Sequence, residues 1–179
     1  METVLIFIPY YYPPQFIYPD AWESYVSTIP DVKSGDMMTA YSTLLTSDDE
    51  ATRMAAAQTW SVWEGATSKL EVDADYINKY KGDAFAVAFA RIENHFFTNE
   101  GFFERDGWLL EKEQVDRIRK IPTVIVQGRY DIVCPMKTAW ELHRAWPEAK
   151  FQLIKDAGHN ANEPGIQSAL LDACDEFAS

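Results

Sequence analysis

The 179-residue sequence contains only two cysteines, Cys134 and Cys174, and only three histidines. Two cysteines are too few for a disulfide framework and are typical of a reducing compartment, so a cytoplasmic location is expected. Positive charge is also scarce, with 16 Lys and Arg against 28 Asp and Glu and a net charge of −12. This balance argues against nucleic acid and anionic membranes as partners. The apolar run at residues 4–8 is far too short to span a bilayer.

Apolar and aromatic bulk, in contrast, is abundant. Hydrophobic residues make up 47% of the chain and aromatic residues 14%, including six Trp. Side chains of that size suit a large core or a ligand pocket. Charged residues make up 25%, and the whole composition is typical of a globular protein of one domain or slightly more.

The hydrophobic periodicity predicts that the middle of the chain is helical. A loop is predicted over 73–83 and a helix over 84–97. Three earlier helices are predicted over about 20–29, 37–45 and 47–67, capped by Asp20, by Ser34 or Asp36, and by Ser47.

Two carboxylates, Glu64 and Glu93, fall on apolar faces of these helices. Glu64 lies four residues after Trp60 in a stripe at helical spacing, and Glu93 lies at the margin of the aromatic stripe on the helix over 84–97. A carboxylate on an apolar face is costly unless something compensates for its charge. Spacing alone leaves two interpretations open. Each carboxylate either pairs with an arginine such as Arg91 or reaches solvent at the edge of the stripe, or it has a functional role.

The pattern changes from Ile121 onward. The β-branched run over 122–127 predicts a strand buried on both faces, and 150–155 predicts a second short strand. Helices are predicted over 136–146 and 164–177. The order strand–helix–strand–helix is typical of a parallel sheet with helical crossovers, so the sequence is assigned to the α/β class.

Asp131 and His159 each follow a predicted strand, so both are expected at the carboxyl edge of the sheet, where ligands bind in such folds. An Asp that orients a His, and a His that acts as a general base, are two of the three members of a nucleophilic triad. In α/β-hydrolases the acid also precedes the histidine in the chain. The alternative is that Asp131 is a turn residue and His159 a cap residue.

Several motifs occur together in one order along the chain. They are Pro19-Asp-Ala-Trp22, Trp60-Ser-Val-Trp-Glu64, Ala90-Arg-Ile-Glu-Asn-His95, Gly128-Arg-Tyr-Asp-Ile-Val-Cys-Pro135 and Asp156-Ala-Gly-His-Asn-Ala-Asn-Glu-Pro-Gly165. From about Phe16 onward the chain resembles the C-terminal part of proline iminopeptidases, which are α/β-hydrolase serine peptidases that release N-terminal proline. The resemblance implies the C-terminal portion of an α/β-hydrolase fold with a helical cap, without the N-terminal half of the sheet. Three parts are expected: an atypical segment over 1–15, a cap domain over 16–118, and strand–helix units over 119–179.

The resemblance also implies roles for six residues and a substrate class. The substrates would be peptides with N-terminal proline, hydrolysed by a serine mechanism without a cofactor or a metal. The implied roles are Asp131 as triad acid, His159 as triad base, Glu64 and Glu93 as cap carboxylates that bind the free α-amino group, and Val133 and Cys134 as walls of the proline-ring pocket.

One part of the family pattern is absent from the sequence. The family nucleophile lies on a G-x-S-x-G elbow, and none of the nine serines here lies in that context. Loss of a triad member lowers the rate by orders of magnitude, so the chain alone is expected to be inactive or nearly so. Three hypotheses follow: a segment of a proline iminopeptidase, such as a truncated gene copy or fragment; a non-catalytic module that binds N-terminal proline or a protein partner; and half of a split enzyme whose serine a second chain supplies.

Overall fold

The computed structural model of the chain describes residues 14–29 and 36–178. Most of the segment predicted to be atypical, 1–15, and the predicted cap Ser34 therefore lie outside the described residues. The elements are η1 (Pro14–Phe16), α1 (Pro19–Ser27), α2 (Met37–Leu45), α3 (Glu50–Ser68), α4 (Ala74–Tyr80), α5 (Asp83–Thr98), η3 (Glu100–Phe102), η4 (Trp108–Leu110), α6 (Lys112–Ile118), β1 (Val124–Gly128), α7 (Met136–Ala145), β2 (Lys150–Ile154) and α8 (Pro164–Ala178).

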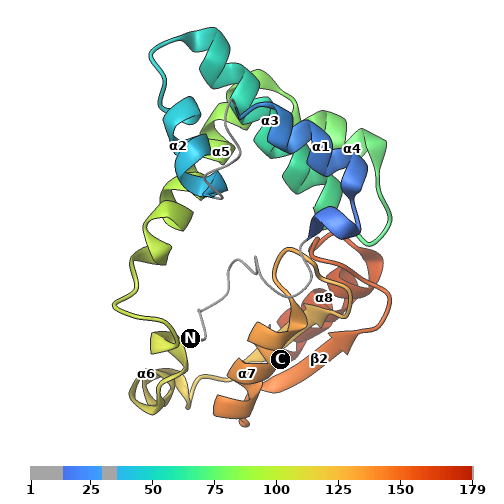
Figure 1. Cartoon of the computed structure of the whole chain (residues 1–179). Helices are drawn as coiled ribbons and strands as arrows, with labels where there is room; N and C mark the ends of the chain where they lie inside the picture. The colour runs from blue at the N-terminus through green and yellow to red at the C-terminus, as the bar shows by residue number, and fades with distance from the viewer. Residues whose placement is uncertain (1–13, 30–35, 179) are drawn as a thin grey trace. The chain divides into compact units, whose positions relative to one another are not determined.

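The described residues form two compact units, which are considered separately (Figure 1). The helical unit consists of the described residues up to 67 together with 72–103, and it contains α1 to α5. The strand unit consists of 68–71 and 104–178, and it contains both strands with α6, α7 and α8.

The helical unit is built around stacked aromatic rings. Tyr41 and Trp60 are fully buried, and their ring centroids lie 5.2 Å apart. Tyr25 stacks on Tyr41 at 4.6 Å and on Trp63 at 5.2 Å, and the Tyr41 hydroxyl donates a hydrogen bond to the carbonyl oxygen of Tyr25. Each such aromatic pair contributes about 0.5–1.5 kcal/mol beyond the area it buries. Much of the aromatic content of the sequence is thus used in the core of this unit.

Side-chain caps start α2 and α3. The Oδ1 of Asp36 accepts the backbone N–H of Thr39 at 3.0 Å, so Asp36, one of the two predicted candidates, caps α2. The cap of α3 was predicted at Ser47, which is wrong. The Oδ2 of Asp49 accepts the backbone N–H of Thr52 at 3.0 Å, and the helix begins at the next residue after Asp49. An aspartate is as good a cap as a serine, so the local sequence permits either start.

Two other parts of the helical unit differ from the prediction. The first helix begins at Pro19, so Asp20 lies in its first turn and is not its cap. Proline fits this position because its fixed φ suits a helix start and its missing N–H would have no partner there. The predicted loop over 73–83 contains α4. Asp73 caps this helix by accepting the N–H of Tyr76, whose hydroxyl contacts that of Tyr80 one turn later.

The strand unit contains two parallel strands joined by a helix. The register of β1 and β2 runs from Val124 opposite Lys150 to Gly128 opposite Ile154. The helix α7 contacts β1, and α8 contacts both strands. The α/β class and the parallel pairing with a helical crossover are therefore confirmed. Among the described residues, however, most of β1 is only partly buried, and α6 was not predicted.

None of the helices within the described ranges combines the length and the apolar character that crossing a bilayer requires.

Candidate active site

The loops that follow β1 and β2 bring Asp131 and His159 together. The Nδ1 of His159 lies 3.0 Å from the Oδ2 of Asp131. The Asp131 side chain is 6% exposed and the His159 side chain is 39% exposed, so the carboxylate is enclosed and the ring reaches the surface. A buried acid that contacts one ring nitrogen leaves the other nitrogen available to a reacting group.

Backbone contacts between the two loops produce this geometry. The parallel register ends with Gly128 opposite Ile154, and just beyond it the N–H of Arg129 donates to the carbonyl oxygen of Ile154 at 2.8 Å. The N–H of Tyr130 then donates to the carbonyl oxygen of Ala157 at 2.9 Å. These bonds join the two chain segments immediately before the acid and the histidine.

The Asp131 carboxylate is held by two further donors. The backbone N–H of Cys134 donates to Oδ1 at 2.7 Å, and the Nε2 of Gln127 donates to Oδ2 at 3.0 Å. The same Gln127 amide lies 3.1 Å from the carbonyl oxygen of Cys134. Sequence reasoning gave Gln127 no role. The available signal was an amide side chain at the end of the β-branched run.

The His159 loop is anchored by the buried carboxylate of Glu163. Its Oε1 accepts the N–H of Gly158 at 2.8 Å, and its Oε2 accepts the N–H of Leu70 at 3.2 Å. The carbonyl oxygen of Ser68 in turn accepts the N–H of His159 at 2.9 Å. Glu163 is only 8% exposed, and sequence reasoning also assigned it no role. The charged residue just before Pro164 was the available signal.

The Asp131 contact strongly favours the protonated form of His159. The pKa of His159 is raised to about 10, chiefly by the hydrogen bond to the Asp131 carboxylate and also by a hydrogen bond with Cys134, while burial acts in the opposite direction. At neutral pH the ring is therefore mainly an imidazolium, because hydrogen bonds and negative charge beside a base stabilise its charged form.

Glu64 and Glu93 lie beside the aromatic core of the helical unit, Glu64 buried and Glu93 partly buried. Glu64 on α3 is 6% exposed. Glu93 on α5 accepts a hydrogen bond from the indole Nε1 of Trp60 at 2.8 Å. Burial is the main reason that the pKa values of Tyr25 and Tyr80 are raised, and both carboxylates add to the shift in each tyrosine. Trp60, which donates to Glu93, lies one helical turn before Glu64 on α3, so the two carboxylates lie beside the same indole.

Val133 and Cys134 lie in the loop between β1 and α7, and both are partly buried. Cys134 is a free thiol. Over the ranges 14–29 and 36–178, no three His, Cys, Asp or Glu side chains gather in a way that would hold a metal ion.

A protein-family profile for the alpha/beta hydrolase fold matches residues 11–165. The chain belongs to the alpha/beta hydrolase fold family. Its relatives include a proline iminopeptidase of Xanthomonas citri, 55% identical over 162 residues, which cover 90% of this chain and 51% of the relative. The chain is also similar to a proline iminopeptidase of Arabidopsis thaliana, which is 51% identical over 87% of this chain and 40% of the relative. A proline iminopeptidase of Neisseria gonorrhoeae is 39% identical over 90% of this chain and 50% of the relative.

The resemblance to proline iminopeptidases in the sequence is thus confirmed across about nine tenths of the chain. The chain spans about half the length, or less, of these curated relatives.

Proposed function

We propose that this α/β-hydrolase chain recognises the N-terminal proline of peptides, as a proline iminopeptidase does, and that it does not cleave them by itself. Glu64 and Glu93 bind the positively charged imino group. Asp131 and His159 are the acid and base of the hydrolytic machinery, and Val133 and Cys134 contact the proline ring.

The placement of Glu64 and Glu93 is the observation that carries the proposal. Two carboxylates from different helices share an environment of aromatic rings, and Trp60 orients one of them. Carboxylates in such surroundings form strong charge-assisted hydrogen bonds with an ammonium group because water screens them little. The aromatic faces add attraction for a cation and an apolar contact for a pyrrolidine ring.

The Asp131–His159 pair supports the hydrolytic assignment but lacks a hydroxyl to activate. A triad requires a serine whose oxygen donates to the free nitrogen of the histidine. The sequence has no G-x-S-x-G elbow. No feature of the described residues favours a second chain that would supply the serine, so the proposal includes none.

Calorimetric titration of the purified chain with L-prolinamide tests amine recognition. We expect saturable binding by the wild type and a roughly 10- to 100-fold weaker affinity for Glu64→Gln, because a hydrogen bond to a charged group contributes about 1.5–3 kcal/mol. The Gln substitution keeps the size of the side chain and removes its charge. Glu23→Gln, on the exposed face of α1, is the matched control and should bind like the wild type.

Equal affinities of Glu64→Gln and the wild type would contradict the proposal, as would the absence of saturable heat with the wild type. Glu93→Gln gives an independent second reading. Its amide oxygen still accepts from Trp60, so any loss of affinity reports the missing charge and not a displaced indole.

A further inference from the structure

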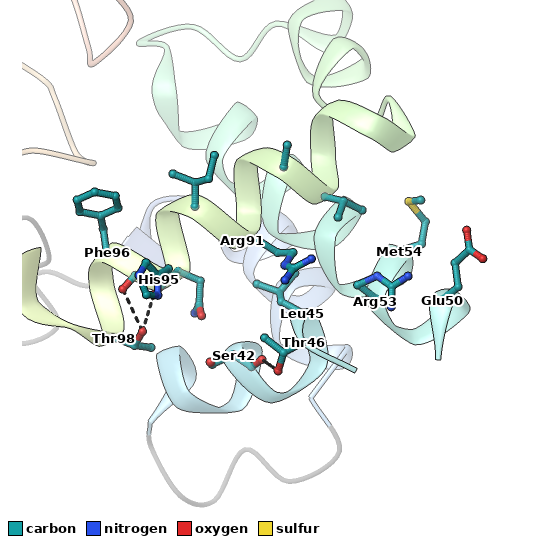
Figure 2. A pocket seen from close by; sticks show the side chains of 14 residues that line it. Ser42, Leu45, Thr46, Glu50, Arg53, Met54, Arg91, His95, Phe96 and Thr98 are labelled. Atoms are coloured by element: carbon teal, nitrogen blue, oxygen red, sulfur yellow. Dashed lines mark hydrogen bonds between the residues drawn. The ribbon is translucent and has the colours of Figure 1, made fainter. Parts of the chain in front are cut away.

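The helical unit contains a pocket of about 780 Å³ that involves neither Glu64 nor Glu93 (Figure 2). Residues of α2, α3 and α5 line it, with Thr46 just after α2. Its volume lies within the range of pockets that bind small molecules, roughly 300–1,000 Å³. None of the side chains assigned above to proline recognition or to acid–base chemistry lines this pocket.

Both arginines of the helical unit line this pocket, although acidic residues far outnumber basic ones in the unit. Within the described part of the chain, Arg91 makes no hydrogen bond and no ion pair. The Nη1 of Arg53 donates to the carbonyl oxygen of Ser47 at 2.6 Å, which leaves its other donors available. Figure 2 shows Arg91 between His95 and Arg53 in the view, with Glu50 beyond Arg53.

The acidic groups near these arginines do not neutralise them. Glu50 lines the pocket and is exposed, and among the described residues it forms no ion pair with either arginine. The pKa of Asp49 is lowered chiefly by its hydrogen bonds with Thr52, and Arg53 adds only a minor effect. The pocket therefore presents an excess of guanidinium charge.

The rest of the pocket lining includes both apolar and polar side chains. The polar ones are Ser42, Thr46, Asn94, His95 and Thr98, and the apolar ones, which form an apolar wall, are Leu45, Met54, Val87, Ala88, Ile92 and Phe96. A guanidinium binds the oxygens of a carboxylate or a phosphate in a bidentate fashion, whereas the apolar wall favours a hydrocarbon group next to them. A ligand that joins a carboxylate or phosphate to a hydrocarbon group therefore matches both the arginines and the apolar wall.

We propose that this pocket binds a small organic anion in which a carboxylate or phosphate group is joined to an apolar group. Arg91 and Arg53 contact the oxyanion, and the side chains around Leu45 contact the apolar part. The site is separate from the proposed proline site and does not depend on it.

Titration of the full chain with three probes that share a phenyl group tests the proposal. The probes are phenylacetate, phenyl phosphate and the uncharged 2-phenylethanol, and binding is followed by calorimetry and by the Nε–Hε NMR signals of the arginines. We expect at least one anion to bind saturably and at least tenfold more tightly than the alcohol, with shifts in the signals of Arg53 and Arg91. Preference for phenylacetate or for phenyl phosphate identifies the oxyanion.

Arg91→Gln should weaken binding of the preferred anion at least tenfold. The control is Lys79→Gln, which should leave the affinity unchanged, because Lys79 is an exposed basic residue of the same unit that does not line the pocket. Arg91 is exposed and makes no hydrogen bond or ion pair with the described residues, so the variant is expected to fold. Equal affinity of Arg91→Gln and the wild type overturns the proposal. So does equal binding of the alcohol and the anions, or the absence of saturable binding by both anions.

Discussion

Gly128→Ala is expected to destabilise the strand unit by about 3 kcal/mol or more, because the new methyl group has no space. A Cβ at Gly128 would lie 1.9 Å from the carbonyl oxygen of Gly158 and 2.7 Å from that of Ala157. Both obstacles are backbone atoms, so no side-chain rotation relieves the clash. Urea unfolding followed by tryptophan fluorescence measures the loss of stability.

Gly82→Ala is the matched control for this substitution. Gly82 has an ordinary φ of −61°, and the nearest atom to an added Cβ is a carbonyl oxygen at 3.6 Å. We expect its free energy of unfolding to remain within about 1 kcal/mol of the wild type. If Gly128→Ala were as stable as Gly82→Ala, the close approach of the two loops that position Asp131 and His159 would be wrong.

Asp131→Asn is expected to lower the pKa of His159 from about 10 toward its ordinary value of 6.5, a shift of up to about three units. The carboxylate is the main cause of the raised pKa, and an amide in its place carries no charge. The pH dependence of the imidazole Cε1–H chemical shift, measured by NMR, reports this pKa directly. Asp156→Asn, an exposed residue in the same loop as His159, is the control and should leave the titration unchanged.

The same pair predicts how stability depends on pH. Because the pKa of His159 is higher in the folded state than the 6.5 of an unfolded chain, folding favours the protonated ring. The stabilising contribution of the pair is therefore complete below about pH 6.5, decreases as the pH rises, and is lost above about pH 10. Solvent screening reduces its size, since the ring is partly exposed. Asp131→Asn should flatten this slope, and an unchanged slope or an unchanged pKa would contradict the geometry of the pair.

A raised pKa also bears on catalysis. A general base must be neutral to accept a proton, and an imidazolium at neutral pH has no free lone pair. Asp131 thus favours the protonated form of His159. A nearby nucleophilic hydroxyl or a bound substrate would have to shift the ring to its neutral form before it could accept a proton.

The sequence was most informative where one local rule determined the structure. The β-branched run over 122–127 placed β1, and helical periodicity placed α5, to within a residue or two; β2 was also placed to within a residue. The position of Asp131 and His159 after parallel strands predicted that they would meet. Competing caps and a proline start shifted helix boundaries, since Asp49 and Ser47 are about equally good caps.

The supporting residues of the site could not be predicted in this way. Glu163 accepts a bond from Leu70, which is distant in sequence. Gln127 contacts Asp131 only four residues later, but that contact depends on the loop after β1 turning back on the strand end. The partner of Glu93 likewise lies on another helix, where Trp60 donates to it. Such pairings depend on how elements pack, which no single-sequence period encodes.

Release of ammonia from L-prolinamide, measured with the purified chain at a ligand concentration that saturates binding in calorimetry, distinguishes recognition from hydrolysis. We expect a saturated complex and no ammonia above the buffer blank, since under the proposed function Glu64 and Glu93 bind the imino group and no elbow serine attacks the carbonyl. Clear turnover by the wild type that is abolished in His159→Ala would contradict this account.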